Sequence, residues 1–429
     1  MSRSSCVIAR RWSRPSARTI EQGGATVSRW FLGVLAITVC LQTAVYGSRP
    51  MVSYKALAIG ATPFDLGVIA ASFAVLSLLV AVPVGRWVDR WGEPPFIAGG
   101  TVLITATTAS LLWIDSVWGL AVNQAALGLG HIMTVIGTQT LIANRGDPGR
   151  RDGRFGVFTV FVSLGQLVGP AAAGLLAGNA IGQPGPGGSQ VGTDLVFVVM
   201  TVVTGLAVVV AASLWRVTPP RARHGADSEV DGGSLLTALP RVLRIQGMPH
   251  AMLASLTVLT SIDLIAAYLP AYGEARGLSV ETVGLLLGVR AAASMATRVL
   301  MLPLIRLAGR RRLLAISMVL PAAALAAFPL ADNTVFLYTA MTIIGFGLGL
   351  GQPVTLAWVA GRAPHSIRGT ALAVRLSGNR LGQTALPVAV GAVAGAAGVA
   401  AVFVSLAGLL VISTTAVLFT SLASDQQEP

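Results

Sequence analysis

Long apolar runs, each close to the length needed to cross a bilayer, dominate this chain and are separated by short polar segments. A helix rises about 1.5 Å per residue, so roughly 20 apolar residues cross the hydrocarbon core. The pattern therefore predicts an all-α integral membrane protein with twelve transmembrane helices. The predicted spans are 30–54, 64–86, 94–114, 117–143, 154–178, 194–215, 250–272, 281–305, 313–331, 334–360, 369–394 and 398–422.

One long polar stretch divides these spans into two groups of six. It is rich in proline and in charges of both signs, which is typical of a flexible linker. The arginine-rich start of the chain is expected to be a cytoplasmic tail without stable structure. The predicted organisation is a tail over 1–29, a six-helix bundle over 30–215, a linker over 216–249, a second bundle over 250–422 and a tail over 423–429.

An internal repeat supports this division. A shift of 217 positions superimposes glycine, proline and polar residues from the second to the fifth predicted helix of each half. The pairs include Gly67 with Gly284, Gly92 with Gly309, Gly128 with Gly345, Gly165 with Gly382, Gln166 with Gln383, and Pro170 with Pro387. Parallel six-helix repeats predict halves related by an axis along the membrane normal, with a substrate site between them.

Composition and charge agree with a membrane protein and exclude a soluble one. Apolar residues make up 54% of the chain, charged residues only 11%, and the mean hydropathy is +0.75. The net charge of +13 is concentrated in alternate loops, which is the positive-inside pattern and places both termini in the cytoplasm. We therefore expect a monomer in a bacterial inner membrane with no nucleic-acid partner.

The sequence contains no motif for enzymatic chemistry. Cys6 and Cys40 provide neither a disulfide framework nor a metal cluster. No phosphate loop, zinc-protease motif, nucleophile elbow or EF-hand loop is present. We predict that the protein is not an enzyme and uses neither a metal nor another cofactor.

A glycine pattern in the fifth predicted helix suggests a close and bendable helix contact. Glycine allows two helix backbones to approach, and proline removes a hydrogen-bond donor and permits a bend. The pattern resembles the antiporter motif of drug–proton exporters in the major facilitator superfamily, although a small-residue stripe that only packs helices would look the same. Its residues are Gly156, Gly165, Gly169, Pro170 and Gly174.

A loop after the second span strengthens this resemblance. Residues 85–92 are similar to the superfamily signature G-x-x-x-D-R-x-G, with Gly85, Asp89, Arg90 and Gly92 at the defined positions. The resemblance implies a gate residue, Asp89, that biases the inward–outward equilibrium. Glu93 departs from the basic residue usual there, and the fourth helix lacks the arginine expected before its Gly-x-Gly, which puts a standard drug–proton antiporter in doubt.

Charged residues inside the second half carry the substrate hypothesis. Arg290 and Arg298 share one face of a predicted helix with Ser294, and Arg375 shares a face of another with Asn379 and Gln383. Arginine forks match carboxylate or phosphate geometry, so these residues could bind an anion. They could equally bond backbone carbonyls or line the interface between the halves. The arginines considered are Arg290, Arg298, Arg375 and Arg380, the last turned about 140° from Arg375.

Asp263 is the one acid deep in a predicted span. A carboxylate at that depth could carry a coupling proton, or it could form a permanent salt bridge with an intramembrane arginine. His131 could relay a proton or simply pack. The resemblance also implies cavity contacts from helices 1, 4, 7 and 10, namely Gln42, Tyr46, Arg49, Gln139, Tyr268 and Gln352. For Arg49, an anion site at the outer mouth and an interfacial anchor both remain open.

These features together predict a secondary transporter of a small organic solute. Proton-coupled export by alternating access is the first hypothesis, because of the antiporter-like glycine motif. Proton-coupled uptake of an organic anion is the alternative, and a membrane sensor that transports nothing is the second alternative.

Overall fold

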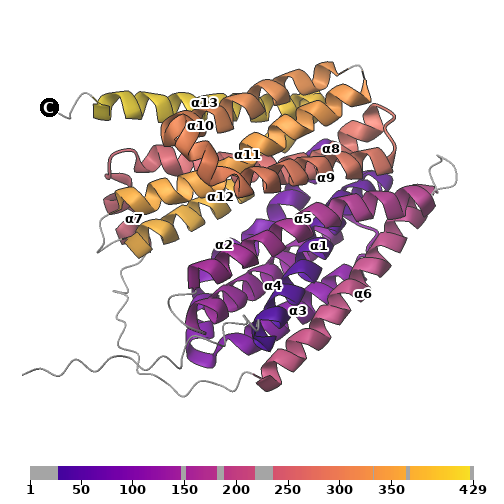
Figure 1. Ribbon diagram of the computed structural model, residues 1–429. Coiled ribbons are helices and arrows are strands. Elements are labelled where there is room, and N and C mark those ends of the chain that lie inside the picture. Colours follow the sequence, from indigo (N-terminus) through magenta and orange to yellow (C-terminus); the bar gives the residue numbers. More distant parts are fainter. Residues whose placement is uncertain are drawn as a thin grey trace, which may run out of the picture.

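The computed structural model describes residues 28–145, 151–180, 188–217, 235–331, 333–363 and 368–425, and its regular elements there are helices (Figure 1). Most of the predicted tails and half of the predicted linker lie outside these ranges. The first long helices are α1 (Arg29–Ala58), α2 (Pro63–Trp91), α3 (Glu93–Ser110), α4 (Val117–Asn144), α5 (Arg151–Ala180) and α6 (Gly188–Val217). The remaining elements are α7 (Leu235–Leu243), α8 (Met248–Ala275), α9 (Val280–Val299), α10 (Met301–Ala327), η2 (Phe328–Leu330), α11 (Thr334–Arg362), α12 (Arg368–Ala397) and α13 (Ala400–Asp425).

The predicted all-α membrane fold is confirmed. Each predicted span corresponds to one long helix, and ten of the described helices are long and apolar enough to cross a membrane. The two long helices outside that group are α3, which is short and rich in threonine, and α12, which carries Arg375 and Arg380. Polar side chains are acceptable in such helices where they face the rest of the bundle and not lipid.

Local caps explain why several helices begin where they do. A capping box between Thr62 and Asp65 starts α2, directly before Pro63 at the first helical position. The side chains of Ser116 and Ser279 accept backbone N–H bonds at the starts of α4 and α9. These short capped turns connect long apolar runs, so the helices can pack antiparallel.

The predicted span 281–305 is wrong at its end. Helix α9 stops at Val299, and α10 begins at Met301 with a break at Gly309, where φ is +74°. Glycine has no Cβ and tolerates this left-handed backbone, so the chain can turn there. The matching glycine of the repeat, Gly92, has φ of +86° between α2 and α3. The repeat therefore extends to backbone conformation.

Helix crossings within each half also follow the repeat. A methyl group added at Gly128 of α4 would lie 1.9 Å from the carbonyl oxygen of Phe73 on α2. At the equivalent position, Gly345 of α11, it would lie 2.1 Å from the carbonyl oxygen of Arg290 on α9. Only glycine permits these backbones to approach so closely. The crossing fixes the position along α9 at which Arg290 sits.

Helices of the two halves meet in two equivalent pairs, α2 with α12 and α5 with α9. In the first pair Gly67 faces Gly391 and the carbonyl oxygen of Pro387. Their repeat equivalents meet in the second pair, where Gly284 faces Gly174 and the carbonyl oxygen of Pro170. These contacts define one end of the molecule, which we call the closed end. There the Tyr268 hydroxyl also donates to the carbonyl oxygen of Pro63, at 2.8 Å.

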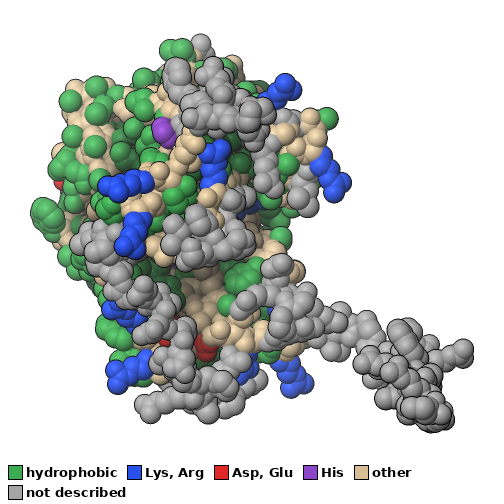
Figure 2. Space-filling view, turned by 90° about the vertical axis from the view of Figure 1, so that its left-hand side faces the viewer, with side chains coloured by type: hydrophobic (Ala, Val, Ile, Leu, Met, Phe, Trp, Pro, Cys, Tyr) green, Lys and Arg blue, Asp and Glu red, His purple; other side chains and the backbone are tan. Residues whose placement is uncertain are grey.

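The opposite end of these helices carries α7, and we call it the diverging end because several glycines there have no close neighbour. A methyl group at Gly85 of α2, Gly156 of α5 or Gly378 of α12 would meet no atom within 4 Å. Figure 2 views this end, and Lys and Arg side chains lie over it on both halves. The exposed arginines of this end include Arg86, Arg90, Arg241, Arg244, Arg306, Arg312 and Arg362.

Candidate functional site

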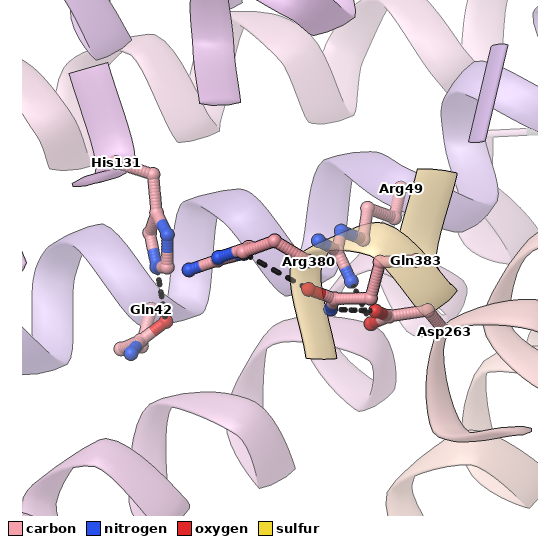
Figure 3. Close-up of polar contacts among 6 residues, drawn as sticks. All are labelled: Gln42, Arg49, His131, Asp263, Arg380 and Gln383. Carbon is pink, nitrogen blue, oxygen red and sulfur yellow. Dashed lines mark hydrogen bonds and ion pairs between the residues drawn. The ribbon is translucent and has the colours of Figure 1, made fainter. Parts of the chain in front are cut away.

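An ion pair joins the two halves near the middle of the bundle. Nη1 of Arg49 on α1 lies 2.5 Å from Oδ1 of Asp263 on α8, and both side chains are largely buried (Figure 3). The Arg49 guanidinium also stacks over the rings of Phe73 and Tyr46, at 4.2 and 4.9 Å from the ring centres. Helix α1 continues through Pro50 to Ala58, which places Arg49 about two turns inside the span. Arg49 is therefore part of the centre, away from the outer mouth that the sequence also allowed.

A chain of polar contacts extends from this pair across α12. Gln383 donates through Nε2 to Oδ2 of Asp263, and its Oε1 accepts a hydrogen bond from Nη1 of Arg380 at 3.1 Å. In Figure 3 the Arg380 guanidinium points toward His131 of α4 and Gln42 of α1, whose side chains lie 3.4 Å apart. This network, which we call the central polar cluster, therefore joins residues from both halves.

Arg290 and Arg298 on α9 form the second group of charges. Arg290 is 4% exposed, makes no hydrogen bond within the described structure, and has an unpartnered Nε. Arg298 donates through Nη1 to the Ser163 hydroxyl of α5, at 2.9 Å, and its Nε is also unpartnered. The phenol of Tyr46 lies in the electrostatic field of Asp263 and of both arginines. Tyr46 therefore contacts Arg49 and interacts electrostatically with the arginines of α9.

Arg375 has a different environment although it is the same kind of residue. It is 4% exposed, and its Nη2 donates to the backbone oxygen and Oε1 of Gln352 and to the Thr355 hydroxyl, all on α11. Gln352 in turn donates to the carbonyl oxygen of Ser255, at 2.7 Å. Arg375 and Gln352 therefore join α8, α11 and α12 through Nη2 of Arg375, while Nε of Arg375 has no hydrogen-bond partner.

The three hydrogen bonds of Arg375 give a stability prediction. We expect Arg375→Gln to lower the free energy of unfolding by about 2 kcal/mol, because it removes charge-assisted hydrogen bonds and leaves buried acceptors without donors. The measurement is the melting temperature of the purified protein in detergent. Arg306→Gln, at an exposed arginine with no contact in the described structure, is the control. Equal stability of the Arg375 and Arg306 variants would contradict a structural role for Arg375.

Other predicted cavity residues take separate positions. Asn379 on α12 is 3% exposed, and its Oδ1 has no hydrogen-bond partner. Tyr268 is fully buried and belongs to the closed end, where its hydroxyl bonds Pro63. Gln139 on α4 is exposed. Lys55 of α1 donates through Nζ to the carbonyl oxygen of Leu111, at 2.6 Å.

The predicted gate residues divide between the two ends. Gly165 and Gly169 of α5 pack on the backbone of α1 within the first half, whereas Gly174 and Pro170 face α9 of the second half. Gly156, at the diverging end, has no neighbour at the position of a Cβ. The glycine motif thus contacts the other half through its last two members.

The loop motif lies at the diverging end. Asp89 and Arg90 are exposed and form no ion pair in the described part of the chain, while Gly92 provides the left-handed turn into α3 and Gly85 faces open space. The gate role of Asp89 stays a prediction.

A small cavity lies next to the central ion pair. Its volume is about 40 Å³, enough for about one water molecule, and its walls include Arg49, Phe73, Gln124, Asp263 and Gln383. Within the described residues, no group of three His, Cys, Asp or Glu side chains is placed to hold a metal ion. The cavity places space for a water molecule beside the Arg49–Asp263 ion pair, where a proton could be relayed.

Comparison with known proteins identifies similar chains. A family model described as Major Facilitator Superfamily matches residues 34–306 and 251–429. An uncharacterized MFS-type transporter of Methanocaldococcus jannaschii is 27% identical over 128 residues, which is 30% of this chain and 33% of that relative. The match therefore spans about a third of the curated relative.

Solved transporter structures resemble the whole described fold. The nucleoside transporter NupG is 14% identical with a TM-score of 0.71, covering 92% of this chain and 99% of its own. The D-xylose–proton symporter is 15% identical with a TM-score of 0.71, covering 91% and 97%. A bacterial homologue of the human lysosomal transporter Spinster, inward-facing and occupied, is 18% identical with a TM-score of 0.69, covering 91% and 96%. At these identities the likeness establishes the fold alone.

Proposed function

The chain belongs to the major facilitator superfamily, and from this membership we propose a secondary active transporter that moves a small organic solute by alternating access. The proposed setting is a monomer in a bacterial inner membrane. Both termini would lie in the cytoplasm, because the exposed arginines gather at the diverging end. In this orientation the solute site opens to the cytoplasm, and the closed end faces outward.

The Arg49–Asp263 ion pair is the observation that carries the proposed coupling. It is the one ion pair between the two halves in the described structure, and it lies beside a cavity that holds about one water molecule. A proton on Asp263 would remove the charge that attracts Arg49 and would change its bond with Gln383. Protonation would therefore weaken a contact between halves that must rearrange during transport. His131 would provide a relay position close to the same cluster.

Two directions of transport follow from different features. The contact of Pro170 and Gly174 with Gly284 favours export, because this is where the antiporter-like motif meets the other half. The unpartnered Arg290 favours uptake of an organic anion. In both versions the protein binds and releases solute without covalent chemistry or a cofactor, and a membrane sensor is the outcome if no solute moves.

Proteoliposomes with a pH-sensitive dye inside test this function. We expect at least one small organic solute to produce proton movement across the membrane that empty liposomes do not show. Solute supplied on one side at equal pH gives the direction of coupled proton flow, and hence separates export from uptake. If carboxylates, phosphonates, sugars, nucleosides and lipophilic amines all move no protons and show no exchange, the transporter proposal fails and the sensor remains.

A further inference from the structure

The centre of the bundle carries more positive charge than its described acids neutralise. Asp263 is the one carboxylate in the central polar cluster, and it is already paired with Arg49. The remaining guanidiniums have neutral acceptors or none: Arg375 has the α11 oxygens, Arg380 has Gln383, Arg298 has Ser163, and Arg290 has no acceptor. Buried charge without a counterion is costly, so an anionic group is the ligand that these guanidiniums would favour.

Arg290 is the residue that points to a ligand. A structural arginine at this depth would bond carbonyl oxygens, as Arg375 does. Arg290 is equally buried, yet it makes no hydrogen bond to any described residue. Asp263 attracts its charge, and Arg298, on the same helix face, repels it. A residue whose only role was to pack the helices would gain no stability from a buried guanidinium without a hydrogen-bond acceptor.

The repeat shows that this charge is specific to one half. The first-half equivalents of Arg290 and Arg298 are Phe73 and Ala81, and the helix crossing at Arg290 is otherwise the same as that at Phe73. The fold therefore needs no arginine at this position. The Arg290 guanidinium therefore has a role other than forming the helix crossing.

We propose that the site formed by Arg290, Arg298 and Tyr46 binds the carboxylate or phosphate group of an organic anion, and that this anion and a proton move in the same direction. The proposal rests on the proposed transporter function and names its substrate class. Tyr46 can donate a hydrogen bond to the anion, and the two guanidiniums provide forked donors.

The direction follows from the charges that face Asp263. The charged groups are Arg49 from α1, Arg290 from α9 and Arg380 from α12. The neutral groups are Tyr46 and Gln383, and His131 of α4 lies beyond Arg380. A proton on Asp263 makes the cluster more positive and so strengthens anion binding. By linkage the bound anion strengthens proton binding by the same factor. Anion and proton therefore travel together, which selects uptake over export.

The first test needs no ligand. We expect Arg290→Gln to raise the melting temperature of the ligand-free protein by about 2–4 °C, because it removes an unpaired charge and no hydrogen bond. Arg375→Gln is expected to lower it, and Arg306→Gln to leave it unchanged. A fall for Arg290→Gln similar to that for Arg375→Gln would show that Arg290 is structural and would overturn the proposal.

The second test uses matched probes on the full-length protein in detergent at pH 6 and pH 8. Citrate, benzoate and phenylphosphonate are the anions, with benzamide and benzylamine as neutral and cationic counterparts. We expect an anion to raise the melting temperature more at pH 6, by mass action on the native state, and Arg290→Gln to remove the shift. Stabilisation only by benzamide or benzylamine, or anion shifts that persist in Arg290→Gln, would overturn it. If no probe shifts the melting temperature, the proposal is decided by the melting temperatures of the ligand-free Arg290→Gln, Arg375→Gln and Arg306→Gln proteins.

The failures are distinguishable. Coupled transport of neutral or cationic solutes alone in proteoliposomes would remove the anion site and leave the transporter standing. Anion binding at Arg290 without any transport would remove the transporter proposal and leave the anion site standing.

Discussion

Asp263→Asn is expected to reduce pH-gradient-driven solute accumulation by about 100-fold while solute exchange at equal pH continues. Asparagine keeps the size of the side chain and its contact with Gln383 but cannot take up and release a proton. The exchange reaction needs the solute site and the movement of the halves, and it needs no net proton transfer. The measurement compares both reactions in the same proteoliposome preparation.

Removing this carboxylate also leaves Arg49 without its partner, so stability must be controlled. Losing one member of a buried pair costs about 3 kcal/mol, and Arg49→Gln combined with Asp263→Asn should recover much of this loss. Asp115→Asn, at an acid whose side chain is 81% exposed, is the matched control and should accumulate solute normally. Unchanged accumulation in a well-folded Asp263→Asn protein would assign coupling to another group.

The fold could be predicted from the sequence because a bilayer leaves few options. A span needs about 20 apolar residues, so each run marked one helix, and short capped turns such as Thr62–Asp65 fixed the ends. The repeat was visible for the same reason: Gly128 and Gly345 are required by equivalent crossings. Only the boundary near Val299 was wrong, because apolar residues continue through the turn there.

The site was harder to predict because helix faces do not reveal their partners. Arg375 and Arg290 have similar spacing to polar neighbours, yet one meets the oxygens of α11 and the other meets none. The pairing of Arg49 with Asp263 joins residues 214 positions apart, and their relative depth depends on where α1 and α8 cross. The turned position of Arg380 relative to Arg375 did indicate that the two arginines face different partners.

The second large effect is expected at the closed end. Gly284→Val should force α9 away from α5, because even a methyl group there would lie 2.6 Å from the Cα of Gly174 and 2.7 Å from the carbonyl oxygen of Pro170. Both obstacles are backbone, so no side chain can move aside. Overpacking of this kind costs about 1–3 kcal/mol, and here only the closed conformation bears that cost. Transport should therefore fall about tenfold or more, because the closed-end state becomes rare.

A labelling experiment separates a shifted equilibrium from a misfolded protein. The labelled position is Ser53→Cys, which lines the small central cavity. Cys6 and Cys40 are replaced by serine, and a membrane-impermeant thiol reagent is added to intact cells. Gly284→Val should increase the labelling rate about tenfold, whereas Gly205→Val, at a glycine of α6 with open space around it, should not.

The repeat extends this prediction to the other interface between the halves. Gly67 faces Gly391 and Pro387 as Gly284 faces Gly174 and Pro170, so Gly67→Val should cause the same rise in labelling. Because both glycine pairs lie at the closed end, either valine substitution alone should suffice to open that end. If Gly284→Val opens the closed end and Gly67→Val does not, the α5–α9 contact acts as the gate and the α2–α12 contact as its hinge. If neither changes labelling or transport, the glycine pairs only pack the helices, and the closed end must be held by the Tyr268–Pro63 hydrogen bond and the central ion pair.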